Sequence, residues 1–267
     1  MDEKEFADEI WYWYLTGEWR VPPPKEIVRM LDRKRKAYGF LPSDPHCLEC
    51  GKPMAGFGGF ILRSGPATFS SRFCGECEQF ARKYESGAEV NLTMIFADIR
   101  GSTPLAEVTP TRDYKTLIQR FYKETSHVLV HHNSMVNRLM GDQVSALFVP
   151  RFSGKEHARA AIEAAQDVLR VTGHGRPEGP WIPVGVGVHT GMAYVGAVGS
   201  ADGVNEIAVL GSAANLCAGL SSSAAAGEIL ISEDSVSSAG WQADDQERRV
   251  LELKGISEKV LVRVMKI

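Results

Sequence analysis

The chain has 267 residues, of which 44% are hydrophobic and 24% are charged, the balance of a globular protein with enough apolar material for a core. A formal net charge of −3 excludes a strong overall attraction to nucleic acid or lipid headgroups. No apolar run approaches the about 20 residues of a membrane span, and the acidic start Met1–Glu5 is not a secretory signal. We therefore expect a cytoplasmic protein without a membrane span.

The first 40 residues predict a helical segment with many aromatic and basic side chains. Trp11 and Tyr14 stand three residues apart, so they share one helical face, and the prolines at 22–24 separate this helix from a second one at 25–38. Basic residues beside aromatic ones raise a nucleic-acid or membrane hypothesis. Positions 25–36 hold only six basic and two acidic residues. We interpret them as a solvated basic turn and expect no nucleic-acid partner.

Four of the five cysteines form two C-x-x-C pairs, Cys47/Cys50 and Cys74/Cys77. Each such turn can present two thiolates to one ion, and the arrangement is typical of a tetrahedral structural Zn²⁺ site. Disulfides and unconnected buried thiols are the alternatives, and a chain without a signal peptide disfavours disulfides. The stretch 54–73, rich in Gly, Ser and aromatics, predicts the hairpin of a zinc ribbon. Cys217 is interpreted as a small core residue.

From residue 91 onward, strand patterns alternate with helix patterns. Strands are expected at 91–98, 134–139, 144–149, 184–190, 207–210 and 227–232, with two more between 249 and 267. Helices are expected at 111–132, 157–171 and 212–223. The Val–Gly alternation at 184–190 continues towards a glycine-bearing hairpin; such glycines are weak evidence of phosphate binding, because closely approaching strands also need them.

Two aspartates stand where a metal site is expected. Asp98 ends the first of these strands, and Asp142 lies in the tight turn between two later ones. After Asp98, Gly101 leads to Ser102 and Thr103, which are good helix N-caps. A carboxylate followed by a helix N-terminus can hold a metal and phosphates together. Each aspartate alone is equally typical of a cap or a turn.

Six stretches in order resemble the catalytic domain of class III nucleotidyl cyclases, the adenylate and guanylate cyclase family. They are FADIRGST (96–103), RLMGDQV (138–144), VGVGVHTGMAYVGAVG (184–199), LGSAANL (210–216), GEILIS (227–232) and LELKG (251–255). The resemblance implies an α+β (α/β) domain. This domain would be a ferredoxin-like βαββαβ sandwich built around a mostly antiparallel sheet. A small N-terminal module, helical and zinc-ribbon-like, would precede it. The expected domains are 1–40 (helical), 41–88 (the zinc-ribbon-like module with four cysteines) and 89–267 (cyclase).

The resemblance also implies ligands and partners. Asp98 and Asp142 match the carboxylates that hold two Mg²⁺ or Mn²⁺ ions, and the Ile99 carbonyl supplies another ligand. Asn215 matches the asparagine that orients the ribose, and Lys254 a lysine that contacts the triphosphate. The substrate would be a nucleoside triphosphate, converted to a 3′,5′-cyclic nucleotide and pyrophosphate in a head-to-tail homodimer. The nucleotide-binding set is Ile99, Gly101, Ser102, Thr103, Arg138, Asn215 and Lys254.

Three positions depart from the family pattern. Arg138 replaces a purine-selecting lysine or glutamate, Ala208 replaces a polar base reader, and Gly219 replaces the transition-state arginine. No arginine occurs between Arg176 and Arg248, so no small shift of alignment restores it. The candidates to replace it in space are Arg100, Arg112 and Arg120. Two hypotheses follow: a divergent and slow cyclase, or a cyclase-fold protein that binds nucleotide and metal without turnover, as a sensor or dimerisation module.

Overall fold

The computed structural model describes all residues except 1, 43–44, 68–71, 84–85, 200–204 and 244. It forms two compact units: unit 1 comprises residues 1–89 and 194–208, and unit 2 comprises residues 90–193 and 209–267. The division into domains 1–40, 41–88 and 89–267 stays a prediction. Among the described residues, no helix combines the length and the apolar character needed to cross a bilayer.

Unit 1 is mainly helical. It contains α1 (Glu3–Thr16), α2 (Lys25–Tyr38), α3 (Gly56–Ile61) and α4 (Gly75–Lys83). A capping box between Asp2 and Glu5 starts α1, and Gly17, with φ 82°, ends it. The predicted hairpin between the cysteine pairs is wrong for the described residues, because a helix, α3, forms there and strand pairing is limited to two isolated bridges. Residues 68–71 of that stretch lie outside the described chain.

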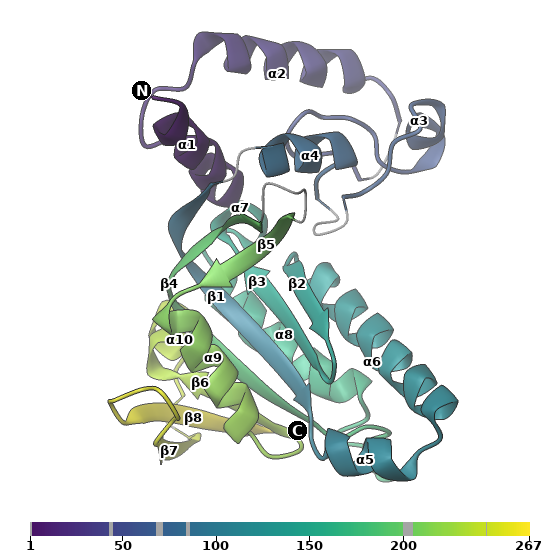
Figure 1. Cartoon of the computed structure of the whole chain (residues 1–267), viewed down its shortest axis with the longest axis vertical. Coiled ribbons are helices and arrows are strands. Elements are labelled where there is room, and N and C mark those ends of the chain that lie inside the picture. Colours follow the sequence, from purple (N-terminus) through teal and green to yellow (C-terminus); the bar gives the residue numbers. More distant parts are fainter. Residues whose placement is uncertain (1, 43–44, 68–71, 84–85, 200–204, 244) are drawn as a thin grey trace. The chain divides into compact units, whose positions relative to one another are not determined.

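A central sheet has the strand order β2-β3-β1-β4-β6-β8-β7, with β5 paired to β4 (Figure 1). The strands are β1 (Gly87–Ile99), β2 (Met135–Met140), β3 (Gln143–Phe148), β4 (Val184–Gly199), β5 (Asn205–Leu210), β6 (Glu228–Ser232), β7 (Glu247–Leu251) and β8 (Val260–Lys266). Pairs β1/β3, β2/β3, β6/β8 and β7/β8 are antiparallel, and β4/β6 is parallel. The predicted α+β class with a mostly antiparallel sheet is confirmed. The turn between β4 and β5 lies outside the described residues.

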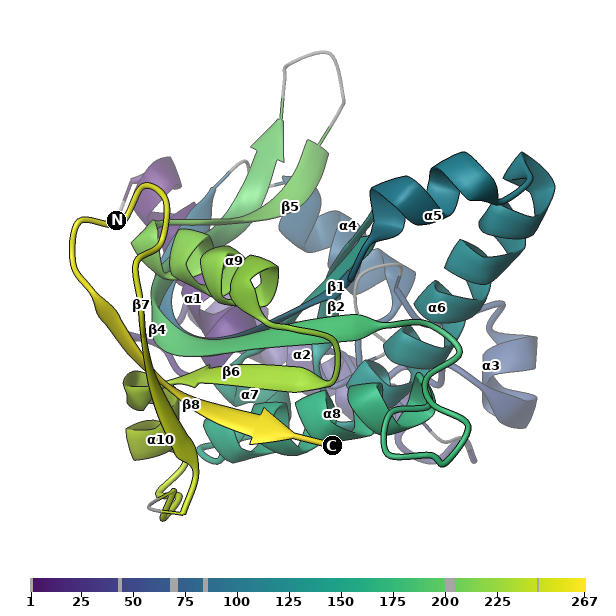
Figure 2. The same cartoon turned by 90° about the horizontal axis from the view of Figure 1, so that it is seen from below.

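Helices cover both faces of the sheet. They are α5 (Ser102–Val108), α6 (Thr111–His131), α7 (Pro150–Ser153), α8 (His157–Val171), α9 (Ser212–Ser223) and α10 (Glu233–Ser238). Figure 2 shows α9 on one side of the sheet, with α8 and α10 on the other. Successive residues of β6 serve the two sides in turn: Ile229 and Ile231 join the core with α6 and α8, whereas Leu230 joins Leu220 of α9.

Helix packing on both faces of the sheet also explains the Val–Gly alternation of β4. Val184, Val186 and Val188 are fully buried in the core with α6 and α8. On the opposite face, a Cβ at Gly187 would lie 2.4 Å from the Ser221 nitrogen, so helix α9 rests directly on the strand backbone. A side chain there would push α9 away from the sheet. These glycines therefore serve helix packing and not phosphate binding.

A chain of buried side-chain hydrogen bonds crosses the core of unit 2. It joins two histidine Nδ1 atoms through four hydroxyl groups, with contacts of 2.8, 2.7, 3.0, 3.2 and 2.8 Å in the order His157, Thr93, Thr190, Ser235, Ser232 and His189. All six side chains are buried. Because buried polar groups are costly unless paired, this chain ties β1, β4, β6, α8 and α10 into one arrangement.

The number of hydrogens in this chain determines the histidine tautomers. Burial lowers the pKa of both His157 and His189, so both are neutral near pH 7. Four hydroxyls donate four hydrogens, but five contacts must be made. The fifth hydrogen must come from the Nδ1–H of one histidine. When all four hydroxyl hydrogens are used within the chain, the other histidine accepts at Nδ1 and carries its hydrogen at Nε2.

We therefore predict that His157 and His189 have opposite neutral tautomers, which ring ¹⁵N chemical shifts in NMR will resolve. Thr93→Val removes one hydroxyl and should release His157 from this constraint, at a cost of about 1–3 kcal/mol for the unsatisfied buried nitrogen. Thr93→Ser keeps the hydroxyl and should keep the opposite tautomers. Identical tautomers in the unmodified protein would contradict this prediction, and two Nε2–H rings would also break the continuous chain, because only four hydrogens would remain for five contacts.

Candidate functional site

Strand pairing brings the two predicted aspartates together. In the antiparallel β1/β3 pair, Asp98 lies opposite Gln143, the residue that follows Asp142. The Ile99 N–H donates to the Asp142 carbonyl at 3.0 Å. The two carboxylates therefore come from adjoining strand ends, although 44 positions separate their residue numbers. The register of the sheet, and not a flexible loop, sets their spacing.

Each carboxylate already has a donor from its own chain. The Arg100 guanidinium forms an ion pair with Asp98, and the Ser102 hydroxyl donates to Asp142. Arg100 is itself fixed, because its backbone N–H donates to the Pro183 carbonyl at 2.8 Å and its Nη1 donates to the Ser222 carbonyl at 2.9 Å. Sequence reasoning considered Arg100 only as a replacement for a missing arginine and missed this role.

The electrostatics of the pair fit a divalent cation. The Asp98 side chain is only 15% exposed, and burial raises its pKa; the Arg100 guanidinium opposes that rise, and the Asp142 charge adds to it. One guanidinium faces two neighbouring carboxylates here, so negative charge remains in excess. Carboxylate and carbonyl oxygens are the ligands that Mg²⁺ and Mn²⁺ prefer. Asp98 and Asp142 therefore offer suitable donors, and the Ile99 carbonyl stays a predicted third ligand.

The helix after Asp98 starts differently from the prediction. Gly101, with φ 69°, is the N-cap of α5, and no side chain caps this helix. Ser102 is the first helical residue, and its hydroxyl turns to Asp142. Predicting Ser102 or Thr103 as the N-cap was wrong, because a tertiary partner competes for the Ser102 hydroxyl and glycine alone accepts the left-handed backbone at 101 without strain.

A pocket of about 770 Å³ lies beside Asp142 and is lined by α5, α6 and the β2–β3 turn. Ser102, Thr103 and Asp142 face it, together with Lys115 and Tyr122 of α6. The Tyr122 hydroxyl donates to the Gly141 carbonyl at 2.7 Å, which holds the turn that carries Asp142. Sequence reasoning placed Tyr122 only within the helix expected at 111–132, so its contact with the turn was missed.

The remaining predicted site residues lie on other elements. Arg138 is an exposed residue of β2, Asn215 is exposed on α9, and Lys254 is exposed in the segment between β7 and β8. None of the three is among the described residues that line the pocket beside Asp142. The structure thus brings Asp98, Asp142, Gly101, Ser102 and Thr103 together and leaves Arg138, Asn215 and Lys254 outside that group.

The position of the missing arginine is closely packed. Gly219 stands one turn after Asn215 on α9, and a Cβ there would lie 3.1 Å from Leu253 Cδ1. Two arginines considered as replacements are engaged elsewhere: Arg100 pairs with Asp98, and Arg120 stacks over the Trp181 ring at 4.0 Å.

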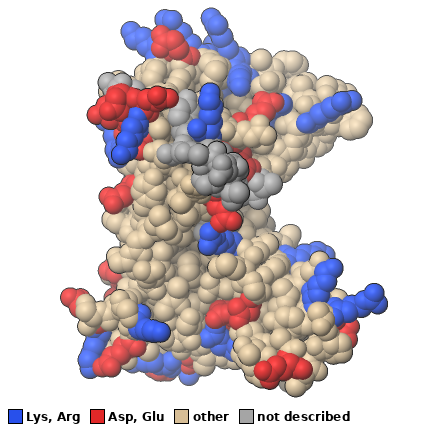
Figure 3. Space-filling model, in the orientation of Figure 1, with Lys and Arg blue, Asp and Glu red and all other residues tan. Residues whose placement is uncertain are grey.

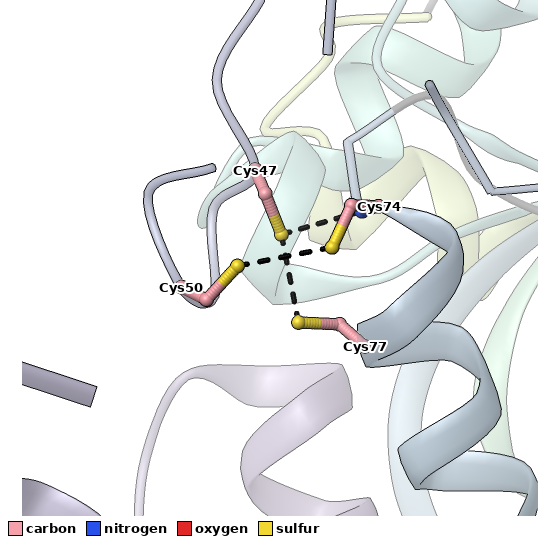
Figure 4. Close-up of side chains that lie close together, drawn as sticks. All are labelled: Cys47, Cys50, Cys74 and Cys77. Carbon is pink, nitrogen blue, oxygen red and sulfur yellow. Dashed lines mark hydrogen bonds between the residues drawn. The ribbon is translucent and has the colours of Figure 1, made fainter. Parts of the chain in front are cut away.

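The four paired cysteines converge in unit 1, as Figure 4 shows. Their Sγ atoms lie within 4.8 Å of one another, all four residues are buried, and none forms a disulfide. The sulfur pairs Cys47/Cys77 and Cys50/Cys74 are each 3.7 Å apart. Four sulfurs placed tetrahedrally about 2.3 Å from one ion would be about 3.8 Å apart. The cluster therefore has the size of a four-thiolate metal site.

Local structure supports the ligand form of these thiols. Gly51, with φ 74°, closes the first turn, and Cys77 lies in the first turn of α4, where the helix dipole favours a thiolate. Hydrogen bonding among the four thiols lowers the pKa of Cys47 and Cys74 and raises that of Cys50 and Cys77. His46 precedes Cys47 in the chain but is not one of the four clustered residues. Its Nε2 atom lies 3.1 Å from the Leu41 carbonyl oxygen. Cys217 is fully buried in unit 2, as expected for a core residue.

Comparison with known proteins identifies the fold. Residues 84–265 match the model of the adenylate and guanylate cyclase catalytic domain. The crystal structure of the guanylyl cyclase Cya2 is 25% identical, covers 67% of this chain and 93% of that one, and has a TM-score of 0.58. That of the adenylyl cyclase CyaB from P. aeruginosa is 26% identical, covers 68% and 96%, and has a TM-score of 0.57.

Curated relatives are longer proteins. An uncharacterized protein of Rhizobium meliloti is 30% identical over 173 residues, which make up 63% of this chain but only 17% of that protein. The chain thus spans under a quarter of the length of the first such relatives. The chain belongs to the family of adenylate and guanylate cyclase catalytic domains.

Proposed function

We propose that this protein is a nucleotidyl cyclase that converts a nucleoside triphosphate into a 3′,5′-cyclic nucleotide and pyrophosphate. The observation that carries this proposal is the pairing of Asp98 with Asp142 at adjoining strand ends, with the Ile99 backbone between them. A half-buried carboxylate pair with excess negative charge is suited to two Mg²⁺ or Mn²⁺ ions. Such ions activate a hydroxyl nucleophile and neutralise a triphosphate.

The chain's own residues would then position the substrate. The ribose 3′-hydroxyl loses its proton, its oxygen bonds to the α-phosphorus, and the bond to the bridging oxygen breaks so that pyrophosphate leaves. Backbone N–H groups at Gly101 to Thr103 would face the phosphates. Asn215 would orient the ribose, and Lys254 would contact the triphosphate. Arg138 offers several donors to a base edge.

A composite site explains why these residues are separated in one chain. Asn215, Lys254 and Arg138 are exposed on elements that do not line the Asp142 pocket. In a head-to-tail homodimer, the second copy would present these residues to the carboxylates of the first. We therefore propose that a dimer is the active form.

A second function is favoured by the packing at Gly219. The neighbouring Leu253 side chain occupies the space beside that position, and Ala208 has no polar atom with which to read a base. A chain of this kind would bind nucleotide and metal as a sensor or dimerisation module without turnover.

The deciding measurement is product analysis by mass spectrometry, with ATP, GTP, CTP and UTP each supplied with Mn²⁺ and then Mg²⁺. A cyclase should form a cyclic product from at least one of them. In known metal sites, loss of a residue that only hydrogen-bonds to a metal ligand costs about 10- to 100-fold in metal affinity or activity. We therefore expect Asp98→Asn, which removes a direct ligand, to lose more than about 100-fold.

Asp234→Asn is the matched control, because Asp234 is an exposed aspartate of α10. It should behave as the unmodified protein does. Metal-dependent nucleotide binding without any cyclic product would support the sensor function. Unchanged Mn²⁺-nucleotide affinity in Asp98→Asn would overturn the assignment of the site under both functions.

If the missing arginine limits the rate, Gly219→Arg should raise turnover, since an arginine on a developing phosphoryl charge contributes about 10³–10⁵ in rate in other phosphoryl-transfer sites. Gly219→Ala adds the same Cβ beside Leu253 without the guanidinium, so it should share any change in Tm but not the gain. Equal turnover in both variants would mean that the arginine is not what limits this enzyme.

We further propose that the four-cysteine cluster holds a structural Zn²⁺ ion. Metal analysis should find about one zinc per chain. Cys50→Ser should lose the metal and lower the Tm, because metal binding supplies folding free energy. Cys217→Ser makes the same chemical change in unit 2 and should keep the zinc. Full zinc content in Cys50→Ser would contradict the four-thiolate site.

A further inference from the structure

Helix α3 has its glycines inside and its large apolar side chains outside. A Cβ at Gly58 would lie 2.9 Å from Pro53 Cβ, and one at Gly59 would lie 2.9 Å from the Met54 carbonyl carbon. Only glycine fits at these two positions, so this face of the helix is held against the module. Phe57 and Phe60 therefore point outward and are 67% and 83% exposed.

Two more apolar residues extend this surface. Ile61 is 52% exposed, and Phe40, which follows α2, is 76% exposed. The Pro42 carbonyl lies 3.2 Å from the Cβ position of Gly58, so the chain just after Phe40 runs along α3. We call Phe40, Phe57, Phe60 and Ile61 the α3 apolar surface. Clustered exposed side chains of this size mark an interaction site.

Helix α2 presents a basic face. Lys25, Arg29, Arg33 and Lys36 are all exposed and follow helical spacing, whereas Leu31 on the other side is buried. The exposed Asp32 lies on the same face, so the four cations outnumber one carboxylate there. No ion pair joins these four cations to any described residue. Figure 3 shows blue groups, with a red group among them, along the edge where α2 runs in Figure 1. We call these four residues the α2 basic face.

Contacts through the first cysteine turn connect the two surfaces. Arg35 of α2 donates from Nε to the Glu49 carbonyl at 2.9 Å and from Nη2 to the Leu48 carbonyl at 3.4 Å. Both carbonyls lie inside the Cys47–Cys50 turn, and Gly51 packs against the Arg35 backbone. The same turn leads through Pro53 and Met54 to the buried side of α3. The cysteine cluster thus fixes α2 and α3 to a common base.

We propose that unit 1 docks on an anionic lipid membrane, with the α3 apolar surface inserted at the headgroup–acyl boundary and the α2 basic face against the headgroups. Stable peripheral attachment needs two signals, an apolar insertion and a basic patch, and this module offers both. A second copy of the chain that docked through the same surface would place its α2 basic face against that of the first copy, and the like charges would repel. A nucleic acid would use the basic face and leave the phenylalanines without a partner.

The test is flotation of the full chain with phosphatidylcholine vesicles, compared with vesicles in which about a third of the lipid is phosphatidylglycerol. Binding should be stronger to the anionic vesicles by about tenfold or more and should weaken as salt is raised. Phe57→Ser with Phe60→Ser should reduce binding to both vesicles. Arg29→Glu with Arg33→Glu should remove only the preference for anionic lipid.

Matched controls are Val250→Ser, at an exposed apolar residue of β7, and Lys123→Glu, at an exposed residue of α6. Both should bind as the unmodified chain does. In Phe60→Trp, quenching of the added tryptophan by brominated acyl chains should report insertion directly. The double phenylalanine variant should keep its zinc content and Tm; a drop in Tm would show that these side chains serve internal packing and would overturn the proposal.

Other outcomes identify other occupants. Absence of vesicle binding by the unmodified chain overturns the membrane proposal. Retention on DNA or RNA that only the arginine variant loses would assign the basic face to nucleic acid. A smaller particle mass in the phenylalanine variant alone, measured by light scattering, would assign the α3 apolar surface to self-association.

Discussion

Strand β4 imposes the constraint on which unit 2 depends. Its valines fill the core with α6 and α8, and its glycines let α9 rest on the strand backbone from the other side. A larger side chain at Gly187 would meet the backbone of α9 and move the helix that carries Asn215 and Gly219. One short alternating segment thus sets the thickness of the domain and the position of one part of the proposed site.

The carboxylate part depends on a different constraint, the register of β1 against β3. A shift by one residue would turn Asp98 to the other face of the sheet and separate it from Asp142. The donors Arg100 and Ser102 then hold each carboxylate in place before any cation binds. In the proposed reaction, such preorganisation would let positioning and charge, rather than a change of shape, provide most of the rate.

Much of the fold could be predicted, because its elements have strong local patterns. Helix α9 spans 212–223 and helix α2 spans 25–38, as expected from periodicity and flanking turn residues. The predictions that failed were those in which a short segment has two reasonable partners. Ser102 suits an N-cap but donates to Asp142, and the glycine-rich stretch after Pro53 suits a hairpin but packs as helix α3.

The sequence by itself determined the family and the cysteine cluster and singled out Asp98 and Asp142 as the predicted metal ligands, since each rests on residue types at fixed spacing. Tertiary structure alone decided that Arg100 pairs with Asp98, that Tyr122 holds the turn of Asp142 and that four apolar side chains stay exposed around α3. The physical reason is the distance along the chain that separates the residues in contact. Spacing encodes local geometry within one or two turns of chain, whereas these contacts join residues through the packing of separate elements, which no local pattern records.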